Sequence, residues 1–363
     1  MYFADLLKTK RPVRLNLKNM SIERNNQKFI IIVLQTFTSK PVHILRNLEG
    51  NKLQWKISVL FLVSLFVFNS CLNSTKQKNI ETPTSGSIKI EIDESFQPLL
   101  DTEVFTFTTF YHNAHIRPVY KPEVDVVNDF MHDSVPVMVT SRKLTDNQIQ
   151  YLRDSLIVAR TISFAWDALA LITNRENHDS LLKYDVVKDI FTGKIQNWNE
   201  IDPKSKLGPI KVIFDNTKSG NIRYFKEQFS IDSLGKNFFA VNTNPEVINF
   251  VSRNPDALGI ISVNWISDKN DSLARSFIKK VNIEAISQEY INDGSYYRPN
   301  QGWIYEKTYP FVREVYLISR ETFVGLGTGF IQWATGEQGQ KIVLKSGLVP
   351  ATMPIRIVQI KHE

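Results

Sequence analysis

Short β-rich segments alternate with amphipathic helical segments from residue 87 onward, and this alternation limits most strongly the folds open to the chain. The predicted strands are Ile88–Asp93, Ile116–Tyr120, Val135–Val139, Ala168–Thr173 and Lys211–Phe214. One predicted helix begins at Ser95-Phe96. Three further predicted helices cover 124–131, Tyr184–Phe191 and 222–229. Strands that alternate with helices usually form a parallel sheet with helices on both faces. We therefore predict an α/β fold.

Apolar residues at helical spacing predict which side of a helix is buried. Val124, Val127, Phe130 and Met131 have this spacing in the helix at 124–131. We expect this face to pack on the sheet.

An apolar run of 12 residues, Ile57–Phe68, follows Lys52 and Lys56. The run has the length of a signal-peptide core and is shorter than the roughly 20 residues that a membrane-spanning helix needs. We therefore predict a cleaved lipoprotein signal peptide at 53–70.

Cys71 is the only cysteine of the chain and directly follows Ser70. A small residue before a cysteine at the end of an apolar core resembles a bacterial lipobox, in which the cysteine sulfur is acylated and becomes the new N-terminus. The alternative is a free, buried thiol. We predict lipid attachment at Cys71, and no disulfide can form within the chain.

Basic residues are concentrated before Cys71. Eleven of the 44 lysines and arginines, but only three of the 37 acids, lie in residues 1–70, so the rest of the chain carries 33 bases and 34 acids. The formal net charge of +7 therefore describes the leader, and the near-neutral remainder lacks the basic footprint of a nucleic-acid-binding protein. Residues 1–52 are assigned no fold, and translation is expected to start after Met1, near Leu53 if that codon is an alternative start.

The polar stretch 71–86 has no periodicity and is predicted to be a tether, with folded structure from Ser87. Such a tether would lift a folded domain off a membrane.

Ser219, Gly220 and Asn221 lie between the strand at Lys211–Phe214 and the next helix. The free N–H groups at a helix N-terminus favour anions, glycine permits close approach of a ligand, and the serine and asparagine side chains add donors. An ordinary helix cap is the alternative.

Ser141 and Arg142 follow the strand at Val135–Val139, at the sheet edge where α/β proteins usually bind ligands. Arg142 offers a forked set of donors suited to a tetrahedral oxyanion, although a surface arginine is the alternative. Lys143 is assigned to a solvated turn.

Other motifs give no catalytic or metal site. His112 and His115 lack a matching acidic or cysteine ligand set. Gly325–Gly329 lacks the Lys and Ser/Thr of a phosphate-binding loop and is predicted to be a loop that caps a helix at Phe330–Trp333.

Several segments, in order, resemble the phosphate-binding proteins of bacterial ABC importers, the PstS family. They are Val139–Leu144, Ala165–Asn174, Asp189–Trp198, Ser219-Gly220, Asn254–Ile261, Tyr309-Pro310 with Arg313, and Gly339-Gln340 through Gly347–Pro350. The resemblance covers nearly all of residues 87–355, and its most specific parts are Phe-Thr-Gly-Lys-Ile-x-Asn-Trp and Gly-Gln…Gly-Leu-Val-Pro.

The resemblance implies a type II periplasmic-binding-protein fold, in which two α/β lobes joined by two hinge crossovers close on a ligand in the cleft between them. Lobe one would comprise 87–166 and 286–363, and lobe two 167–285. The positions that match the family's phosphate site are Ser95, Phe96, Ser141, Arg142, Ser219, Gly220 and Asn221.

Two positions depart from the family pattern. The family's Ser-Gly-Thr ends in Asn221 here, and the arginine usually four positions before its serine is Asp215. Arg223 is a candidate to replace that arginine. Because phosphate near neutral pH carries a proton and sulfate does not, we hypothesise that Asp215 accepts a hydrogen bond from phosphate. The alternative is that Asp215 caps its loop or faces solvent.

The sequence thus predicts a monomeric, non-enzymatic lipoprotein on the periplasmic side of a bacterial membrane. It would capture inorganic phosphate without a cofactor or metal and deliver it to an ABC permease. The alternatives are a receptor for another small oxyanion or solute, and a sensory lipoprotein outside transport. A phosphatase or other hydrolase would need a metal cluster or an activated nucleophile, and the sequence shows neither.

Overall fold

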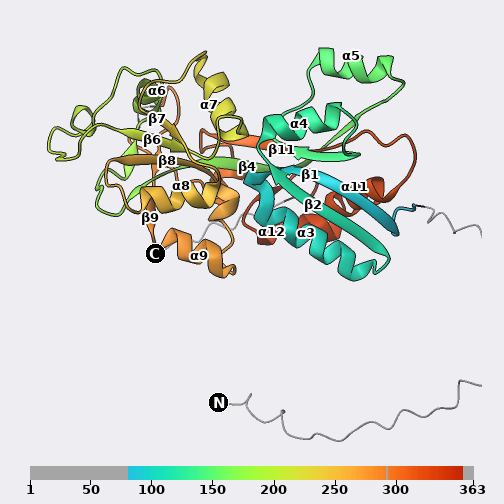
Figure 1. Ribbon diagram of the computed structural model, residues 1–363. Coiled ribbons are helices and arrows are strands. Elements are labelled where there is room, and N and C mark those ends of the chain that lie inside the picture. Colours follow the sequence, from blue (N-terminus) through green and yellow to red (C-terminus); the bar gives the residue numbers. More distant parts are fainter. Residues whose placement is uncertain (1–80, 292, 355–363) are drawn as a thin grey trace, which may run out of the picture. The chain divides into compact units, whose positions relative to one another are not determined.

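One mixed sheet carries the fold, and the computed structural model describes it over residues 81–291 and 293–354 (Figure 1). The strands are β1 (Gly86–Asp93), β2 (Ala114–Lys121), β3 (Val137–Thr140), β4 (Arg160–Asn174), β5 (Leu181–Leu182), β6 (Lys211–Phe214), β7 (Phe238–Ala240), β8 (Ala257–Ser262), β9 (Val281–Ile283), β10 (Ala285–Ile286), β11 (Val312–Ser319) and β12 (Val349–Pro350). The α-helices are α3 (Gln97–Phe110), α4 (Glu123–Met131), α5 (Asp146–Asp154), α6 (Tyr184–Phe191), α7 (Gly220–Phe229), α8 (Asn244–Val251), α9 (Ser272–Ile278), α10 (Gln301–Tyr305), α11 (Leu326–Thr335) and α12 (Glu337–Lys345). Cys71 and the apolar run before it lie outside the described residues.

Strand β4 belongs to two halves of the sheet. The strand order is β2-β1-β3-β11-β4-β8-β6-β7, and β9 and β12 also pair with β4. Strands β5 and β10 form a separate two-stranded parallel sheet. The first part of β4, up to Ala168, pairs with β11, and the part from Leu169 pairs with β8. We call β1, β2, β3 and β11 with the first part of β4 the first half, and β6, β7 and β8 with the second part the second half.

Helices cover both faces of each half (Figure 1). In the first half, α3, α11 and α12 lie on one face and α4 and α5 on the other. In the second half, α8 and α9 lie on one face and α6 and α7 on the other. The predicted α/β fold is therefore confirmed. Within the described residues no helix combines the length and the apolarity that crossing a bilayer requires.

The prediction that Val124 belongs to the buried face of α4 is wrong. Val124 is 43% exposed, whereas Val126, Val127 and Phe130 are buried. The buried stripe begins at Glu123, which is one or two turns before these residues and is 1% exposed. A polar residue therefore begins the buried face, one position before the valine that the pattern assigned to it.

The segment Gly325–Gly329 is also wrong as a loop, since α11 already begins at Leu326. A Cβ at Gly329 would lie 1.8 Å from the carbonyl oxygen of Pro83. Glycine is needed because the chain before β1 crosses the helix at this point. Glu81, in the stretch expected to be a tether, accepts from the N–H of Leu326 at 3.0 Å.

Glu103 of α3 is a buried carboxylate far from the loops that follow the strands of either half. It is fully buried, its Oε2 accepts from Trp333 Nε1 at 3.2 Å, and its Oε1 has no partner in the described chain. Burial raises the pKa of Glu103 to about 9. The folded state therefore holds a proton on this group that the unfolded state loses above about pH 4.3.

We predict that Glu103→Gln raises the unfolding free energy by about 2 kcal/mol at pH 8 and leaves it nearly unchanged at pH 4, because stability is lost as pH rises toward the raised pKa. Chemical denaturation at the two pH values measures this. Glu337→Gln, at an exposed glutamate of α12, is the control and should show no gain at pH 8. Equal effects of Glu103→Gln at both pH values would contradict the assignment.

Candidate functional site

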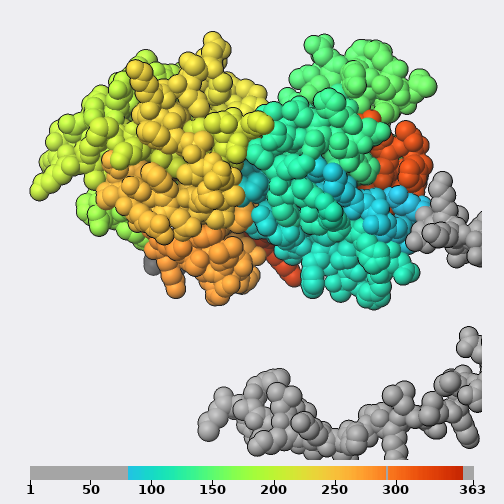
Figure 2. Space-filling view, viewed as in Figure 1, coloured from blue at the N-terminus to red at the C-terminus, as the bar shows by residue number. Residues whose placement is uncertain are grey.

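Loops that follow β1, β3, β6 and β8 meet between the two halves of the sheet, at the edge where α/β proteins usually bind ligands. Across this contact, Ser95 Oγ donates to Asn221 Oδ1 at 3.1 Å, and Asn264 Nδ2 donates to Ser95 O at 3.2 Å. Figure 2 shows the surfaces of α7 and α8 adjoining those of α4 and α3. We call the polar residues of this contact the junction. They are Asp93, Glu94, Ser95, Glu123, Thr140, Ser141, Asp215, Ser219, Gly220, Asn221, Arg223, Asn244 and Asn264.

Ser219 and Asn221 form the start of α7 within the junction. Ser219 Oγ accepts from the N–H of Asn221 at 2.9 Å and donates to Asp215 Oδ2 at 2.7 Å. Ser219 is therefore a helix cap, and Asp215 accepts from it. The side chain of Asn221 accepts from Ser95 and donates to Asn244 Oδ1 at 3.3 Å. The structure thus brings these sequence-predicted residues together.

Gly220 is a point of close approach between the two halves. A Cβ on Gly220 would lie 2.7 Å from Asp93 Oδ2 and 2.9 Å from Glu123 Oε1. These distances are shorter than real Cβ contacts, so any side chain would push a carboxylate away. Glycine lets the backbone of α7 come this close to the first half.

Two sequence-predicted residues have partners of a different kind. Phe96 is fully buried, and the guanidinium carbon of Arg313 lies 5.0 Å from its ring centroid. Arg142 donates from Nη2 to Gln148 Oε1 at 3.0 Å, in the first turn of α5. Its hydrogen-bonded guanidinium is therefore directed to α5 and not to the junction.

Glu123 is at the centre of the junction, although the sequence did not single it out. Its Oε1 accepts from Thr140 Oγ1 at 2.7 Å, and from the N–H and Oγ of Ser141 at 3.2 and 2.9 Å. Arg223 donates from Nε to Oε2 and from Nη2 to Oε1. Burial alone would raise the pKa of Glu123, but the hydrogen bonds and charge of Arg223 hold it below its ordinary value. An acid just after Pro122 looks like an ordinary first-turn residue, which is why it was missed.

Two further carboxylates of the junction keep an oxygen without a partner. Asp93 Oδ2 and Asp215 Oδ1 are buried and have no hydrogen-bond partner within the described chain. Burial, together with the charge of Glu123, raises the pKa of Asp93 to about 7, and burial raises the pKa of Asp215 to about 6. These oxygens can accept hydrogen bonds from a ligand that carries O–H or N–H groups.

Arg313 and Asp167 form a buried ion pair beside the junction. They face each other on β11 and β4, with 2.9 Å between Arg313 Nη2 and Asp167 Oδ2. Ser262 Oγ also donates to Asp167 Oδ2, at 2.9 Å. The charge of Arg313 is therefore balanced, and its Nε donates to Asp167, but its Nη1 and Nη2 have no hydrogen-bond partner within the described chain.

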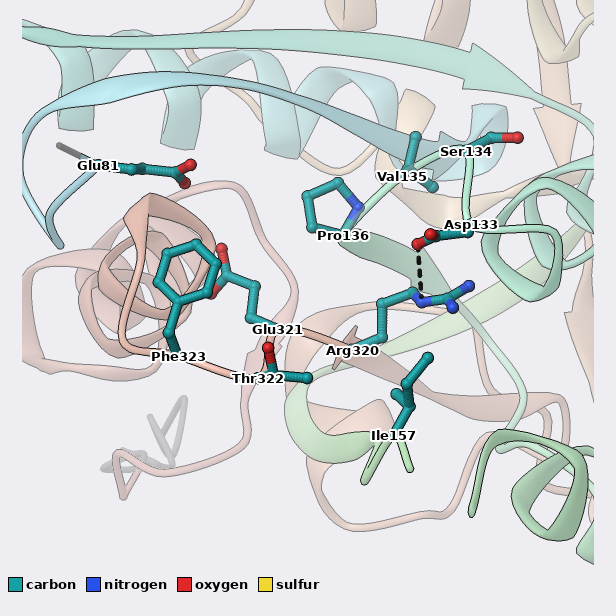
Figure 3. A pocket seen from close by; sticks show the side chains of 10 residues that line it. All are labelled: Glu81, Asp133, Ser134, Val135, Pro136, Ile157, Arg320, Glu321, Thr322 and Phe323. Carbon is teal, nitrogen blue, oxygen red and sulfur yellow. Dashed lines mark ion pairs between the residues drawn. The ribbon is translucent and has the colours of Figure 1, made fainter. Parts of the chain in front are cut away.

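A pocket of about 370 Å³ lies away from the junction, at the amino end of β3 (Figure 3). Arg320 is paired there with Asp133, at 3.3 Å between Nε and Oδ1. Glu321 accepts from the N–H groups of Gly327 and Thr328 at 2.9 and 2.6 Å and so caps α11. Because these charged groups already have structural partners, this pocket is a weaker candidate than the junction.

A groove of about 800 Å³ runs between α3, α9 and α12. Its lining includes Asn264, a residue of the junction that donates to Ser95 O, and Gln97, two residues after Ser95. The groove therefore brings solvent close to the junction. Among the described residues, no three or more His, Cys, Asp or Glu side chains are grouped to hold a metal ion.

A family model described as the PBP superfamily domain matches residues 77–338. The phosphate-binding protein PstS of Borreliella burgdorferi is 22% identical over 308 residues, which cover 81% of this chain and 97% of that protein. PstS of Staphylococcus aureus strain RF122 is 25% identical over 171 residues, 46% of this chain and 52% of that protein. The resemblance predicted from the motifs is confirmed.

Solved structures share the fold. A putative phosphate ABC transporter substrate-binding protein from Clostridium perfringens, with bound phosphate, matches with a TM-score of 0.62 and 24% identity over 73% of this chain and all of that one. An ABC-type phosphate transport receptor from Vibrio cholerae matches with a TM-score of 0.56 and 18% identity over the same shares. The type II periplasmic-binding-protein fold is therefore confirmed.

We predict that Asp167→Ala lowers the unfolding free energy by about 3–5 kcal/mol, because it leaves the Arg313 charge buried without its partner. Urea denaturation measures this. The double variant Asp167→Ala/Arg313→Met removes both charges and should recover much of the loss. Equal stability of the single and double variants would show that the ion pair does not hold the strands at this point.

Proposed function

Because the chain belongs to the PBP superfamily, we propose that it is an extracytoplasmic substrate-binding protein that captures inorganic phosphate and delivers it to an ABC permease. The junction carries this proposal. Hydroxyl groups of Ser95, Ser141 and Ser219 come from both halves of the sheet and meet near Arg223 and the start of α7. Hydroxyls, a guanidinium and a helix N-terminus together are groups that recognise an oxyanion. The protein is proposed to be a receptor and not an enzyme.

Phosphate would bind between two lobes that close on it, lobe one being 87–166 with 286–363 and lobe two 167–285. Two features support this division. Strand β4 passes from one half of the sheet to the other near Ala168. The hydrogen bond from Ser95 to Asn221 also joins residues of different lobes. The site would include Ser95, Phe96, Ser141, Asp215, Ser219, Gly220 and Asn221. Arg142, which was also predicted from the sequence, would join it only by releasing Gln148.

Asp215 would select phosphate against sulfate. Its Oδ1 is buried and has no partner in the described chain, so it is available to a proton that phosphate carries and sulfate lacks. Asp93, from the other half, offers a second such oxygen. Since these acceptors also suit other donor-bearing ligands, a receptor for a different small solute is the second candidate.

The proposed location is the periplasmic side of a bacterial membrane, with a lipid on Cys71. The tether predicted at 71–86 would be shorter, because the chain from Glu81 onward contacts α11. The apolar run before Cys71 and its preceding lysines support export. The protein would act as a monomer. A sensory role without transport is the alternative in which the permease is absent.

We predict that calorimetry at pH 7.5 in phosphate-free buffer detects binding of inorganic phosphate and much weaker binding of sulfate. Asp215→Asn should lower the ratio of phosphate to sulfate affinity at least tenfold, because the amide can donate to either anion. Asp232→Asn, at an exposed position after α7, is the matched control. If no heat of phosphate binding is detected anywhere between pH 5 and pH 8, the proposed function is contradicted. If Asp215→Asn leaves the ratio of phosphate to sulfate affinity unchanged, only the role of Asp215 is contradicted.

A further inference from the structure

The carboxylate of Glu123 is bound as an oxyanion ligand would be. It accepts from two hydroxyls, Thr140 Oγ1 and Ser141 Oγ, from the backbone N–H of Ser141, and from two nitrogens of the Arg223 guanidinium. These are the donors that recognise carboxylate and phosphate groups in proteins. Side-chain exposure of Glu123 is 2%, so the set is also largely closed to water.

The donors around Glu123 come from both halves of the sheet. Thr140 is the last residue of β3 in the first half and Ser141 follows it, whereas Arg223 is in α7 of the second half. Arg223 Nη2 also donates to Ser141 Oγ at 3.1 Å, so the set is continuous across the halves. An anion in the position of the Glu123 carboxylate would therefore be bound by donors from both halves of the sheet.

Arg223 is an arginine of the junction that could serve an anion, and Glu123 neutralises it. Beside the junction, Arg313 keeps Nη1 and Nη2 without a hydrogen-bond partner in the described chain, but its charge is already balanced. Arg313 is paired with Asp167 and Arg142 is bonded to Gln148. The second partner of Arg223 is Glu227, whose side chain is 64% exposed and which contacts the outer nitrogen Nη1. The inner nitrogens, Nε and Nη2, are therefore used by Glu123.

We propose that Glu123 is a tethered competitor of the ligand, which occupies the oxyanion-binding groups of Ser141 and Arg223 and which an incoming anion must displace. This inference rests on the proposed function. A group held on the same chain competes at an effective concentration in the millimolar range or above, and the ligand's apparent affinity falls accordingly. Glu123 would thus help determine how tightly the protein binds phosphate.

A purely structural role makes the opposite prediction for binding. If Glu123 only braced the two halves, its removal would loosen the closed form and weaken ligand binding or leave it unchanged. A competitor, when removed, makes binding tighter. The direction of the change in affinity therefore separates the two roles.

The test compares Glu123→Gln and Glu123→Ala with the wild-type full-length protein by calorimetry with inorganic phosphate. Glutamine keeps the size and one acceptor oxygen but removes the charge, and alanine vacates the place. Both variants should bind phosphate at least tenfold more tightly. Glu227→Gln removes the other carboxylate on Arg223 and is the matched control, with a change of less than threefold expected.

Thermal unfolding with and without 1 mM phosphate provides a second measurement, which also shows that the variants are folded. The phosphate-induced rise in Tm should be larger in both Glu123 variants than in the wild type, because ligand stabilisation follows affinity. If the wild type binds phosphate and neither folded variant binds more tightly, the competitor role is overturned while the proposed function stands. If wild type and variants all fail to bind phosphate, the proposed function falls as well. Binding by the variants alone would support the competitor role and would contradict the proposed capture of phosphate by the wild type.

Discussion

Strand β4 is the constraint on which the arrangement of the two halves depends. This strand of 15 residues pairs with β11 up to Ala168 and with β8 from Leu169 onward, so the same backbone is fixed in both halves. The Arg313–Asp167 ion pair lies at this transition and is almost fully buried. Because separating a buried ion pair leaves an uncompensated charge, the two strands are held together there in any arrangement. The pair thus fixes β4 to β11 within the first half, directly before β4 passes into the second half.

Backbone N–H groups of the junction are bonded to the protein's own side chains. The N–H of Ser95 is bonded to Asp93, the N–H of Ser141 to Glu123, and the N–H of Asn221 to Ser219. A ligand at these groups therefore replaces existing hydrogen bonds and does not fill unused ones. The free energy of binding is then the difference between the hydrogen bonds made to the ligand and the similar bonds within the protein that they replace. Ligands that also donate to the unpartnered oxygens of Asp93 and Asp215 are favoured, because those bonds replace none.

Regular elements could be predicted where local pattern and packing agree. The helix at Tyr184–Phe191 and the strand at Lys211–Phe214 have the predicted bounds because their apolar residues follow one period and flanking residues end them. Glu123 could not be predicted, since its burial depends on donors that arrive from β3 and α7 through tertiary folding. The same contact explains the exposed Val124, because the buried stripe of α4 starts at the glutamate. Patterns of hydrophobicity cannot identify a polar residue whose partners are distant in the sequence.

The two departures from the resembled family belong to one hydrogen-bond network. Asp215 accepts from Ser219, and Asn221 uses two separate atoms of its amide, one to accept from Ser95 and one to donate to Asn244. A threonine hydroxyl at 221 would be a single atom and could not span the same two partners. An arginine at 215 would bring a cation to the place where Ser219 donates its proton. The acceptor-rich character of the junction therefore belongs to the network as a whole, and restoring either family residue alone would leave its neighbours without partners.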